Sequence, residues 1–330
     1  MKCTVLGAGS WGTALAVQLA RQGHDTWLWD RNPARCRVIN EEHRNPRYLK
    51  SVTLPDNLTA HSDLAEATAH AQLLVPVVPS HALREVMQAA VGSIRPDAHI
   101  SVATKGIEDG TLKTMHEVMV EIVGSPERIS MLYGPSFALE VANGLPTAVV
   151  AAGPDETAHF AADAFHGPQF RCYHTEDTIG VCIGGSLKNV MAIACGVSDG
   201  VGLGSNARAA IITRGLAEIS RLAVAVGANP LTLAGLAGMG DLVLTCTGNL
   251  SRNRRVGLAL GEGRTLQSIL DELGEVAEGV ITAKTARALA HKVGVEMPIT
   301  EQIYALLYDN KPAQQAMAEL MGRERRAERD

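Results

Sequence analysis

Three glycines near the start of the chain stand at G-x-G-x-x-G spacing between a short apolar run and a helical run. The apolar run, residues 3–6, predicts a β-strand, and residues 10–22 predict a helix. In this context Gly7 allows a tight turn, Gly9 lets the backbone approach a pyrophosphate, and Gly12 lets the helix pack closely on the strand. The motif therefore predicts a dinucleotide-binding α/β fold, with the anion at the start of the helix.

The second predicted strand, residues 26–29, leads directly into an acidic residue. Asp30 follows this strand, at the place where an acid holds the ribose hydroxyls in folds of this class. Arg31 and Arg35 come soon after it, and guanidinium groups favour the 2′-phosphate of NADP. The sequence thus leaves both NADH and NADPH open, and Arg35 is equally well explained as a solvated residue at a helix start.

Length and composition restrict the class of protein. At 330 residues and 34.9 kDa, the chain is longer than most single domains, which favours two. A net charge of -5 and a pI near 6.1 argue against nucleic acid and for small molecules as partners. The six cysteines form no C-x-x-C pair, which indicates reduced thiols in the cytoplasm and implies no disulfide framework and no metal site.

The alternation of β-rich and helical runs stops at about residue 178. Before that point the pattern predicts a mostly parallel sheet covered on both faces, and after it the chain reads as successive helices. We therefore predict a Rossmann-like α/β domain over residues 1–178 and an all-α substrate-binding domain over residues 179–330. A charge-free stretch at 222–240 contains Asn229-Pro230 and four glycines, so we expect two buried helical pieces and no membrane insertion.

The remaining predicted elements follow from the same patterns. Pro76 lies inside one predicted strand, which favours an edge or a bulge there. The further strands are 73–78, 99–103, 129–132, 147–151 and 170–174. The helices of the second half are 178–197, 207–226, 231–237, 251–260, 266–273, 279–293, 299–309 and 313–321.

Turns that follow predicted strands are the first places to seek functional side chains, because ligands bind beyond the carboxyl ends of strands in open α/β sheets. Three such turns carry unusual residues, at 78–80, 104–106 and 133–138. Lys105 stands between a strand end and a glycine, from where its side chain could reach an anionic or carbonyl oxygen. The alternative is a solvated turn lysine.

Lys188 lies in an otherwise apolar helix, residues 182–192, which predicts that it is buried. Gly184 and Ala192 lie four residues before and after it on the same face, which predicts space for a ligand beside the ammonium group. Burial and a second nearby cation such as Lys105 would lower its pKa from ~10.4 toward neutrality, where a lysine can give and take a proton. The alternative is a lysine that snorkels to the helix surface.

Two further positions add an acid and an anion-binding site. Asp241 ends a long apolar stretch, which is costly unless the carboxylate is paired or bound to substrate hydroxyls. Ser251 is a predicted N-cap, and the helix start that it begins brings free N–H groups, Arg252 and Asn253 to one place. This start would suit a phosphate, although Arg252 and Asn253 fit structural roles equally well. Together the parts predict a dehydrogenase acting on a small phosphorylated or carboxylated alcohol.

Several motifs, taken in their order along the chain, resemble those of a known enzyme family. Through them the chain resembles bacterial-type NAD(P)-dependent glycerol-3-phosphate dehydrogenase over nearly its whole length. The resemblance implies reduction of dihydroxyacetone phosphate to sn-glycerol 3-phosphate, a phospholipid precursor, by a soluble cytoplasmic homodimer. The motifs are G-x-G-x-W-G at the start, Val-Pro-Ser-His-Ala at 78–82, Ala-Thr-Lys-Gly at 103–106, Tyr-Gly-Pro-Ser-Phe-Ala at 133–138, Leu-Lys-Asn-Val at 187–190, Gly-Asp-Leu-Val-Leu-Thr-Cys-Thr at 240–247 and Ser-Arg-Asn-Arg at 251–254.

The resemblance also implies roles for individual residues. Lys188 would be the proton donor and acceptor, and both Lys105 and Arg252 would lie between cofactor and substrate. The family commonly has a glycine at the position of Asp30, which leaves the choice between NADH and NADPH open. The cofactor contacts would be Ser10, Trp11, Arg31, Ala138 and Glu278. The substrate side would be lined by Gly134, Ser136, Asp241, Ser251 and Asn253.

Two other functions remain compatible with the sequence. One is a related two-domain reductase acting on a hydroxy acid such as 6-phosphogluconate or ketopantoate. The other is a non-catalytic module that senses a dinucleotide and dimerises through its helical half. The predicted burial of Lys188 argues against a sensor, because a sensor needs no buried proton carrier.

Overall fold

The computed structural model describes residues 1–273, 277–324 and 327. Its first half is built on one eight-stranded sheet with the order β3-β2-β1-β4-β5-β6-β7-β8. Neighbouring strands are parallel except for β6 and β7, which are antiparallel, so the predicted mostly parallel sheet is confirmed. The strands are β1 (Lys2–Leu6), β2 (Asp25–Trp29), β3 (Leu58–His61), β4 (Leu73–Pro76), β5 (His99–Val102), β6 (Ile129–Tyr133), β7 (Thr147–Ala152) and β8 (Phe170–Thr175).

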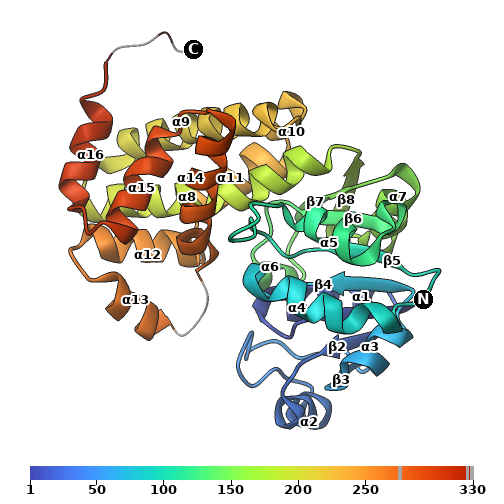
Figure 1. Cartoon of the computed structure of the whole chain (residues 1–330). Coiled ribbons are helices and arrows are strands. Elements are labelled where there is room, and N and C mark those ends of the chain that lie inside the picture. Colours follow the sequence, from blue (N-terminus) through green and yellow to red (C-terminus); the bar gives the residue numbers. More distant parts are fainter. Residues whose placement is uncertain (274–276, 325–326, 328–330) are drawn as a thin grey trace.

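Helices cover both faces of this sheet, each over its own apolar core (Figure 1). One core lies beneath four helices and includes Leu15, Ile39 and Phe165. The other includes Leu83 and Met119 and extends to the start of the following helical half. The first set is α1 (Ser10–Arg21), α2 (Pro33–Glu42), α6 (Ala138–Ala142) and α7 (Asp155–Phe165), and the second is α3 (Leu64–His70), α4 (Ser80–Ala90) and α5 (Met115–Val123), with short turns η1 (Val91–Ser93) and η2 (Pro126–Arg128).

The second half of the described chain contains helices and no strand. Its centre is α8 (Thr178–Val201), which runs from the sheet into the middle of the other helices (Figure 1). Its sequence is largely apolar on all sides, which allows almost every one of its side chains to be buried. Around it lie α9 (Gly204–Ala225), α10 (Pro230–Leu233), the π-helical turn η3 (Leu236–Gly240), α11 (Asp241–Thr247), α12 (Arg252–Gly261), α13 (Leu266–Leu273), α14 (Glu278–Val293), α15 (Pro298–Tyr308) and α16 (Ala313–Met321).

Two strand predictions need correction. The sequence analysis missed β3, a four-residue edge strand whose buried and exposed residues alternate. The edge or bulge expected at Pro76 is wrong, because β4 lies inside the sheet between β1 and β5. Proline is tolerated there because it is the last residue of the strand and its carbonyl still accepts from the N–H of Ala103 (2.9 Å).

Two helical stretches are long and apolar enough to cross a membrane when judged by length and composition alone. One is the core helix α8, in which 94% of the most apolar 18-residue stretch is buried. The other spans residues 230–247, and 39% of this stretch is buried. It consists of α10, η3 and α11 in succession, and it carries the charged side chain of Asp241.

Candidate active site

The turn between β1 and α1 has the geometry that its glycines predict. Gly7 has a φ of +120°, and its N–H donates to the carbonyl of Trp29 (3.1 Å). A Cβ at Gly12 would lie 1.9 Å from the carbonyl oxygen of Gly7, so only glycine allows this approach of helix to strand. A Cβ at Gly9 would meet nothing within 4 Å, which leaves the backbone open on the side where an anion would bind.

The same turn fits a bound dinucleotide. No side chain caps the first turn of α1, so its N–H groups are free to bind an anion. The indole Nε1 of Trp11 is buried with no hydrogen-bond partner among the described residues, and a buried donor of this kind normally has one. Ser10 is half-buried at the first position of α1. Free donors, an open backbone and a helix N-terminus are therefore present together.

Asp30, the acid at the end of β2 that was predicted to hold a ribose, already has two hydrogen-bond partners within the protein. The buried carboxylate of Asp30 accepts from the N–H of Asn32 (2.9 Å) and from Nη1 of Arg35 (2.6 Å). Arg35 is therefore an ion-pair partner and not a solvated charge. Arg31 is exposed.

Three charged residues from different parts of the chain meet at the start of α11. Asp241 is 1% exposed, and its Oδ2 accepts from Nζ of Lys105 (2.8 Å), whereas Oδ1 accepts from Nζ of Lys188. Lys188 also donates to the hydroxyl of Thr245 (3.0 Å), which itself donates to the carbonyl of Asp241 (2.6 Å). Lys105, which follows β5, also lies over the ring of Tyr133, 5.2 Å from its centroid. The prediction that Lys188 is buried is confirmed.

In this cluster the pKa of one group, the ammonium of Lys188, lies close to neutral pH. Burial and, to a smaller extent, the charge of Lys105 lower the pKa of Lys188 to about 8, against the opposing effect of Asp241. Burial alone would raise the pKa of Asp241, but the two ammonium groups hold it below its ordinary value. The lowered pKa predicted for Lys188 is therefore confirmed, and at neutral pH the cluster contains one carboxylate beside a lysine that can release its proton.

The space predicted beside Lys188 at Gly184 is wrong. A Cβ at Gly184 would lie 2.8 Å from the carbonyl oxygen of Ala237 and 3.2 Å from Leu233. The missing side chain therefore allows α10 and η3 to pack against α8. Ala192, on the other side, is fully buried in the helical core.

Hydrogen bonds at and near the turn that carries Lys105 connect the two halves of the chain. The N–H of Gly106 donates to the hydroxyl of Ser186 on α8 (3.0 Å). Nearby, the carboxylate of Glu278, the first residue of α14, accepts from the N–H (3.1 Å) and the hydroxyl (2.6 Å) of Ser80, at the start of α4. Glu278 thus bonds to the N-terminus of a helix on the sheet, where a carboxylate is favoured.

The predicted phosphate site at the start of α12 is partly used for structure. Ser251 caps the helix by accepting from the N–H of Arg254 (3.2 Å), which confirms the predicted N-cap. The side chain of Asn253 donates to Asn189 (2.9 Å) and accepts from the N–H of Gly279 (2.9 Å), so it joins α8 to α14. One of the two acceptor positions of its side-chain carbonyl is therefore already used. Arg252 is half-buried on the first turn.

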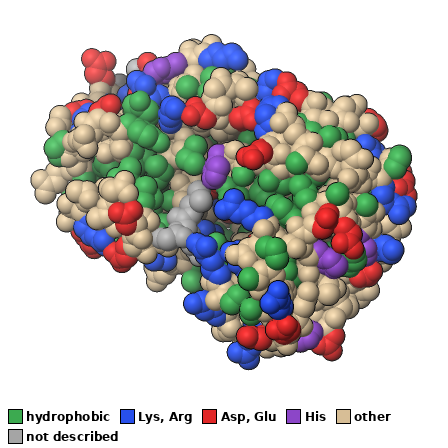
Figure 2. Space-filling view, turned by 60° about the horizontal axis from the view of Figure 1, so that its bottom comes forward, with side chains coloured by type: hydrophobic (Ala, Val, Ile, Leu, Met, Phe, Trp, Pro, Cys, Tyr) green, Lys and Arg blue, Asp and Glu red, His purple; other side chains and the backbone are tan. Residues whose placement is uncertain are grey.

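The turn after β6 packs tightly where the sheet meets the helical half. A Cβ at Gly134 would lie 2.8 Å from Cα of Val149, and the hydroxyl of Ser136 donates to the carbonyl of Gly134 (2.9 Å). Ala138 is the first residue of α6, whose N-terminus has no side-chain cap. Figure 2 shows basic side chains on the face of the molecule where the two halves meet.

Two family models match the two halves of the chain. The model described as NAD-dependent glycerol-3-phosphate dehydrogenase N-terminus matches residues 2–159, and the C-terminus model matches residues 177–318. The chain belongs to the NAD-dependent glycerol-3-phosphate dehydrogenase family.

Relatives support this membership along the whole length. The glycerol-3-phosphate dehydrogenase (NAD(P)+) of Anaeromyxobacter dehalogenans is 53% identical over 331 residues, covering 99% of this chain and 100% of the relative. The enzyme of the same name from Stenotrophomonas maltophilia is 50% identical over 329 residues, covering 99% and 96%. A crystal structure of glycerol-3-phosphate dehydrogenase from Coxiella burnetii, 44% identical, matches with a TM-score of 0.93 over 97% of this chain and 98% of that one.

In this glycerol-3-phosphate dehydrogenase family member, three residues that support the cluster or the glycine-rich turn were given no individual role from the sequence, although two of them stand inside quoted motifs. Thr245 lies four residues after Asp241 on α11, a spacing that places both on one helix face. Tyr133 donates from its hydroxyl to the carbonyl of Thr104 (2.6 Å), and burial raises its pKa well above the ordinary value, so the phenol stays neutral. Asn45 donates to the carbonyl of Ala8 (3.0 Å) and so holds the glycine-rich turn.

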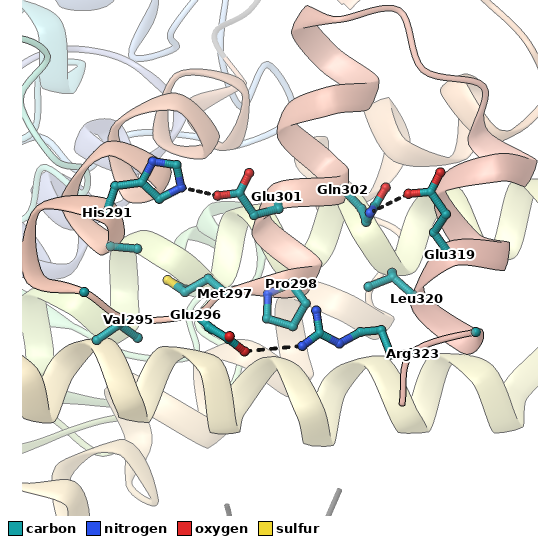
Figure 3. Close-up of a pocket in the computed structure, with 13 residues that line it drawn as sticks. His291, Val295, Glu296, Met297, Pro298, Glu301, Gln302, Glu319, Leu320 and Arg323 are labelled. Carbon is teal, nitrogen blue, oxygen red and sulfur yellow. Dashed lines mark hydrogen bonds and ion pairs between the residues drawn. The ribbon is translucent and has the colours of Figure 1, made fainter. Parts of the chain in front are cut away.

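A hollow of about 880 Å³ lies elsewhere in this dehydrogenase, between the end of α14, α15 and α16 (Figure 3). Its charged lining residues bind to one another, His291 to Glu301 (2.5 Å) and Arg323 to Glu296 (3.4 Å). The predicted site residues do not line it. The residues singled out from the sequence lie instead at the lysine–aspartate cluster and the glycine-rich turn.

Proposed function

We propose that this chain catalyses the reversible reduction of dihydroxyacetone phosphate to sn-glycerol 3-phosphate with NADH or NADPH. The observation that carries the proposal is the buried cluster of Lys188, Asp241 and Lys105. A ketone that accepts a hydride needs a proton on its oxygen, and the cluster contains a lysine whose pKa is about 8. Family membership supplies the substrate and the cofactor.

The bound dinucleotide would supply the hydride that reduces the ketone carbon. Lys188 would give its proton to the ketone oxygen during reduction and take it back during oxidation. An ammonium group has three N–H donors, and the protein uses two of those of Lys188, for Asp241 and Thr245. The third remains for the substrate oxygen. Lys105 would polarise the same oxygen.

The remaining residues would bind and orient the two ligands. The helix starts at α1 and α12 supply N–H donors for phosphate groups, and the Arg252 guanidinium would add a charge-assisted contact to the substrate phosphate. On the cofactor side we place Gly7, Gly9, Ser10, Trp11, Gly12, Asp30, Arg31, Ala138 and Glu278, with Lys105 and Arg252 between the two ligands. On the substrate side we place Gly134, Ser136, Asp241, Ser251 and Asn253.

We extend the proposal to organisation and cellular context. We place the division of domains between residues 178 and 179, since β8 ends at Thr175 and α8 begins at Thr178. The product is a precursor of phospholipids, so the enzyme would serve lipid synthesis as a cytoplasmic homodimer without membrane insertion. The six free cysteines and the burial of α8 support this location.

The test follows loss of reduced nucleotide absorbance when the purified protein is mixed with dihydroxyacetone phosphate. We expect rapid loss with NADH, NADPH or both, and none when the substrate lacks its phosphate. Turnover of ketopantoate or 6-phosphogluconate in place of dihydroxyacetone phosphate would support the related reductases. Tight nucleotide binding without turnover of any of these substrates would support the sensing module.

A further inference from the structure

We propose that the ion pair between Asp30 and Arg35 makes this enzyme select NADH over NADPH. The inference rests on the proposed function and names the cofactor of the same site. It depends on the observation that one of the two arginines that follow β2, Arg35, is already held by a buried carboxylate.

Asp30 occupies a fixed position beside the glycine-rich turn. It follows β2, and the preceding residue, Trp29, accepts from the N–H of Gly7 (3.1 Å). The N–H of Asp30 donates to the carbonyl of His61 (3.0 Å), and its own carbonyl accepts from Sγ of Cys36 (3.4 Å). The carboxylate therefore stands at the carboxyl end of β2, where the adenosine ribose lies in folds of this kind.

The contacts of this carboxylate are compatible with an unphosphorylated ribose. One oxygen accepts from the N–H of Asn32 (2.9 Å) and the other from Arg35 (2.6 Å). Each carboxylate oxygen can accept two hydrogen bonds, so both keep capacity for ribose hydroxyls. With NADH the ion pair stays intact, and the side chain of Asp30, 4% exposed, keeps its cation.

A 2′-phosphate on the ribose would compete with Asp30 for the charge of Arg35. The phosphate would bring up to two negative charges to the position of a carboxylate. Arg35 contacts Asp30 through Nη1, so binding the phosphate through its other N–H groups would divide one positive charge between two anions. Leaving Asp30 altogether would deprive a buried carboxylate of its cation, which is strongly unfavourable. The exposed Arg31 would be left to supply the remaining positive charge. NADPH should therefore bind about 10-fold to 100-fold more weakly than NADH, the range for one lost hydrogen bond to a charged group.

Direct binding measurements test the inference without depending on catalysis. All three tryptophans lie within the first 29 residues, one of them in the glycine-rich turn, so quenching of intrinsic fluorescence should report NADH and NADPH binding. We expect the unmodified protein to bind NADH more tightly. Asp30→Gly should release Arg35, which should lower the affinity for NADH and raise the affinity for NADPH. Asp30→Asn is the substitute if the glycine variant does not fold.

A double variant distinguishes release of Arg35 from simple removal of a negative charge. In Asp30→Gly combined with Arg35→Gln, the gain in NADPH affinity should disappear. Arg37→Gln, an exposed arginine on the same helix, is the matched control and should change neither affinity. Equal binding of both nucleotides, tighter binding of NADPH, or a gain that persists without Arg35 would overturn the inference.

The same experiment separates this inference from the proposed reaction. Selective binding of NADH without turnover of dihydroxyacetone phosphate would support the ion-pair selection and contradict the proposed function. Turnover with equal affinity for the two nucleotides would do the reverse. Binding of neither nucleotide would contradict both.

Discussion

Lys188 and Asp241 lie 53 positions apart in the chain, and the ammonium group of the first donates directly to the carboxylate of the second inside the helical half. Both side chains are buried, so each offsets part of the desolvation cost of the other's charge. Because Lys105 binds the second carboxylate oxygen, one negative charge is shared by two positive charges. The excess positive charge and the burial together make the proton of Lys188 easy to release.

Replacing Lys188 by methionine should remove proton transfer and preserve the apolar packing of α8. We expect kcat for reduction to fall about 10²-fold to 10⁴-fold, the contribution of general acid catalysis, with NADH affinity nearly unchanged. Single-turnover kinetics would measure the rate of the chemical step, and fluorescence titration would measure the affinity for NADH. Near-normal turnover in the variant would exclude Lys188 as the proton donor.

The pH dependence of the two directions should be opposite. Lys188 must carry its proton for reduction and must lack it for oxidation, and its pKa is about 8. The rate of dihydroxyacetone phosphate reduction should therefore fall as pH rises through about 8, whereas the rate of glycerol 3-phosphate oxidation should rise. Initial rates with saturating nucleotide would measure both profiles. Two profiles that change in the same direction would rule out this titration as the cause.

The same lowered pKa has a defined effect on stability. Lys188 titrates near 10.5 when unfolded and near 8 when folded, so between these values the unfolded chain binds more protons. Stability therefore rises with pH in this window as far as Lys188 is concerned. Urea unfolding at a series of pH values should show this rise, and the Lys188→Met variant should lack it.

Features that depend on local backbone geometry were predictable from the sequence. The glycine-rich turn is one of them, because the requirements at Gly7 and Gly12 arise within a single strand–turn–helix unit. The burial of Lys188 was predictable because α8 is apolar on all sides and has no face for solvent. The N-cap at Ser251 was predictable for the same local reason.

Features that depend on which groups meet in the folded chain, or on very short patterns, were not predictable. Space beside Gly184 was expected, but the residues that fill it come from α10 and η3, about 50 positions later. The pairing of Asp30 with Arg35 removed a cation that the sequence left available for a phosphate. The edge strand β3 was not predicted because an alternation of buried and exposed residues over only four positions is too short to recognise. For Gly184 and Asp30 the missing information was which residues they contact in the folded chain.

Removing the guanidinium at the start of α12 should affect substrate binding more than chemistry. Arg252→Ala should raise KM for dihydroxyacetone phosphate about 10-fold or more, since a charge-assisted contact to phosphate is lost, with a smaller change in kcat. Arg255→Ala is the matched control, because Arg255 is exposed on the same helix, and its kinetics should stay normal. An unchanged KM in the Arg252 variant would place the phosphate elsewhere.

Neutralising the shared carboxylate should change both the pKa of Lys188 and the stability of the fold. In Asp241→Asn the attraction that raises the pKa of Lys188 is lost, while burial and Lys105 still lower it. The pH at which reduction declines should therefore move below the value of the unmodified enzyme. The variant should also lose about 3–5 kcal/mol of unfolding free energy at neutral pH, because the buried ammonium group of Lys188 and the partly buried one of Lys105 are left without their carboxylate. Urea unfolding and the pH–rate profile measure the two effects separately, and Asp199→Asn, at an ion pair outside the cluster, should leave the profile unchanged. A profile in Asp241→Asn that stays in place or moves to higher pH would show that the carboxylate does not set the proton affinity of Lys188.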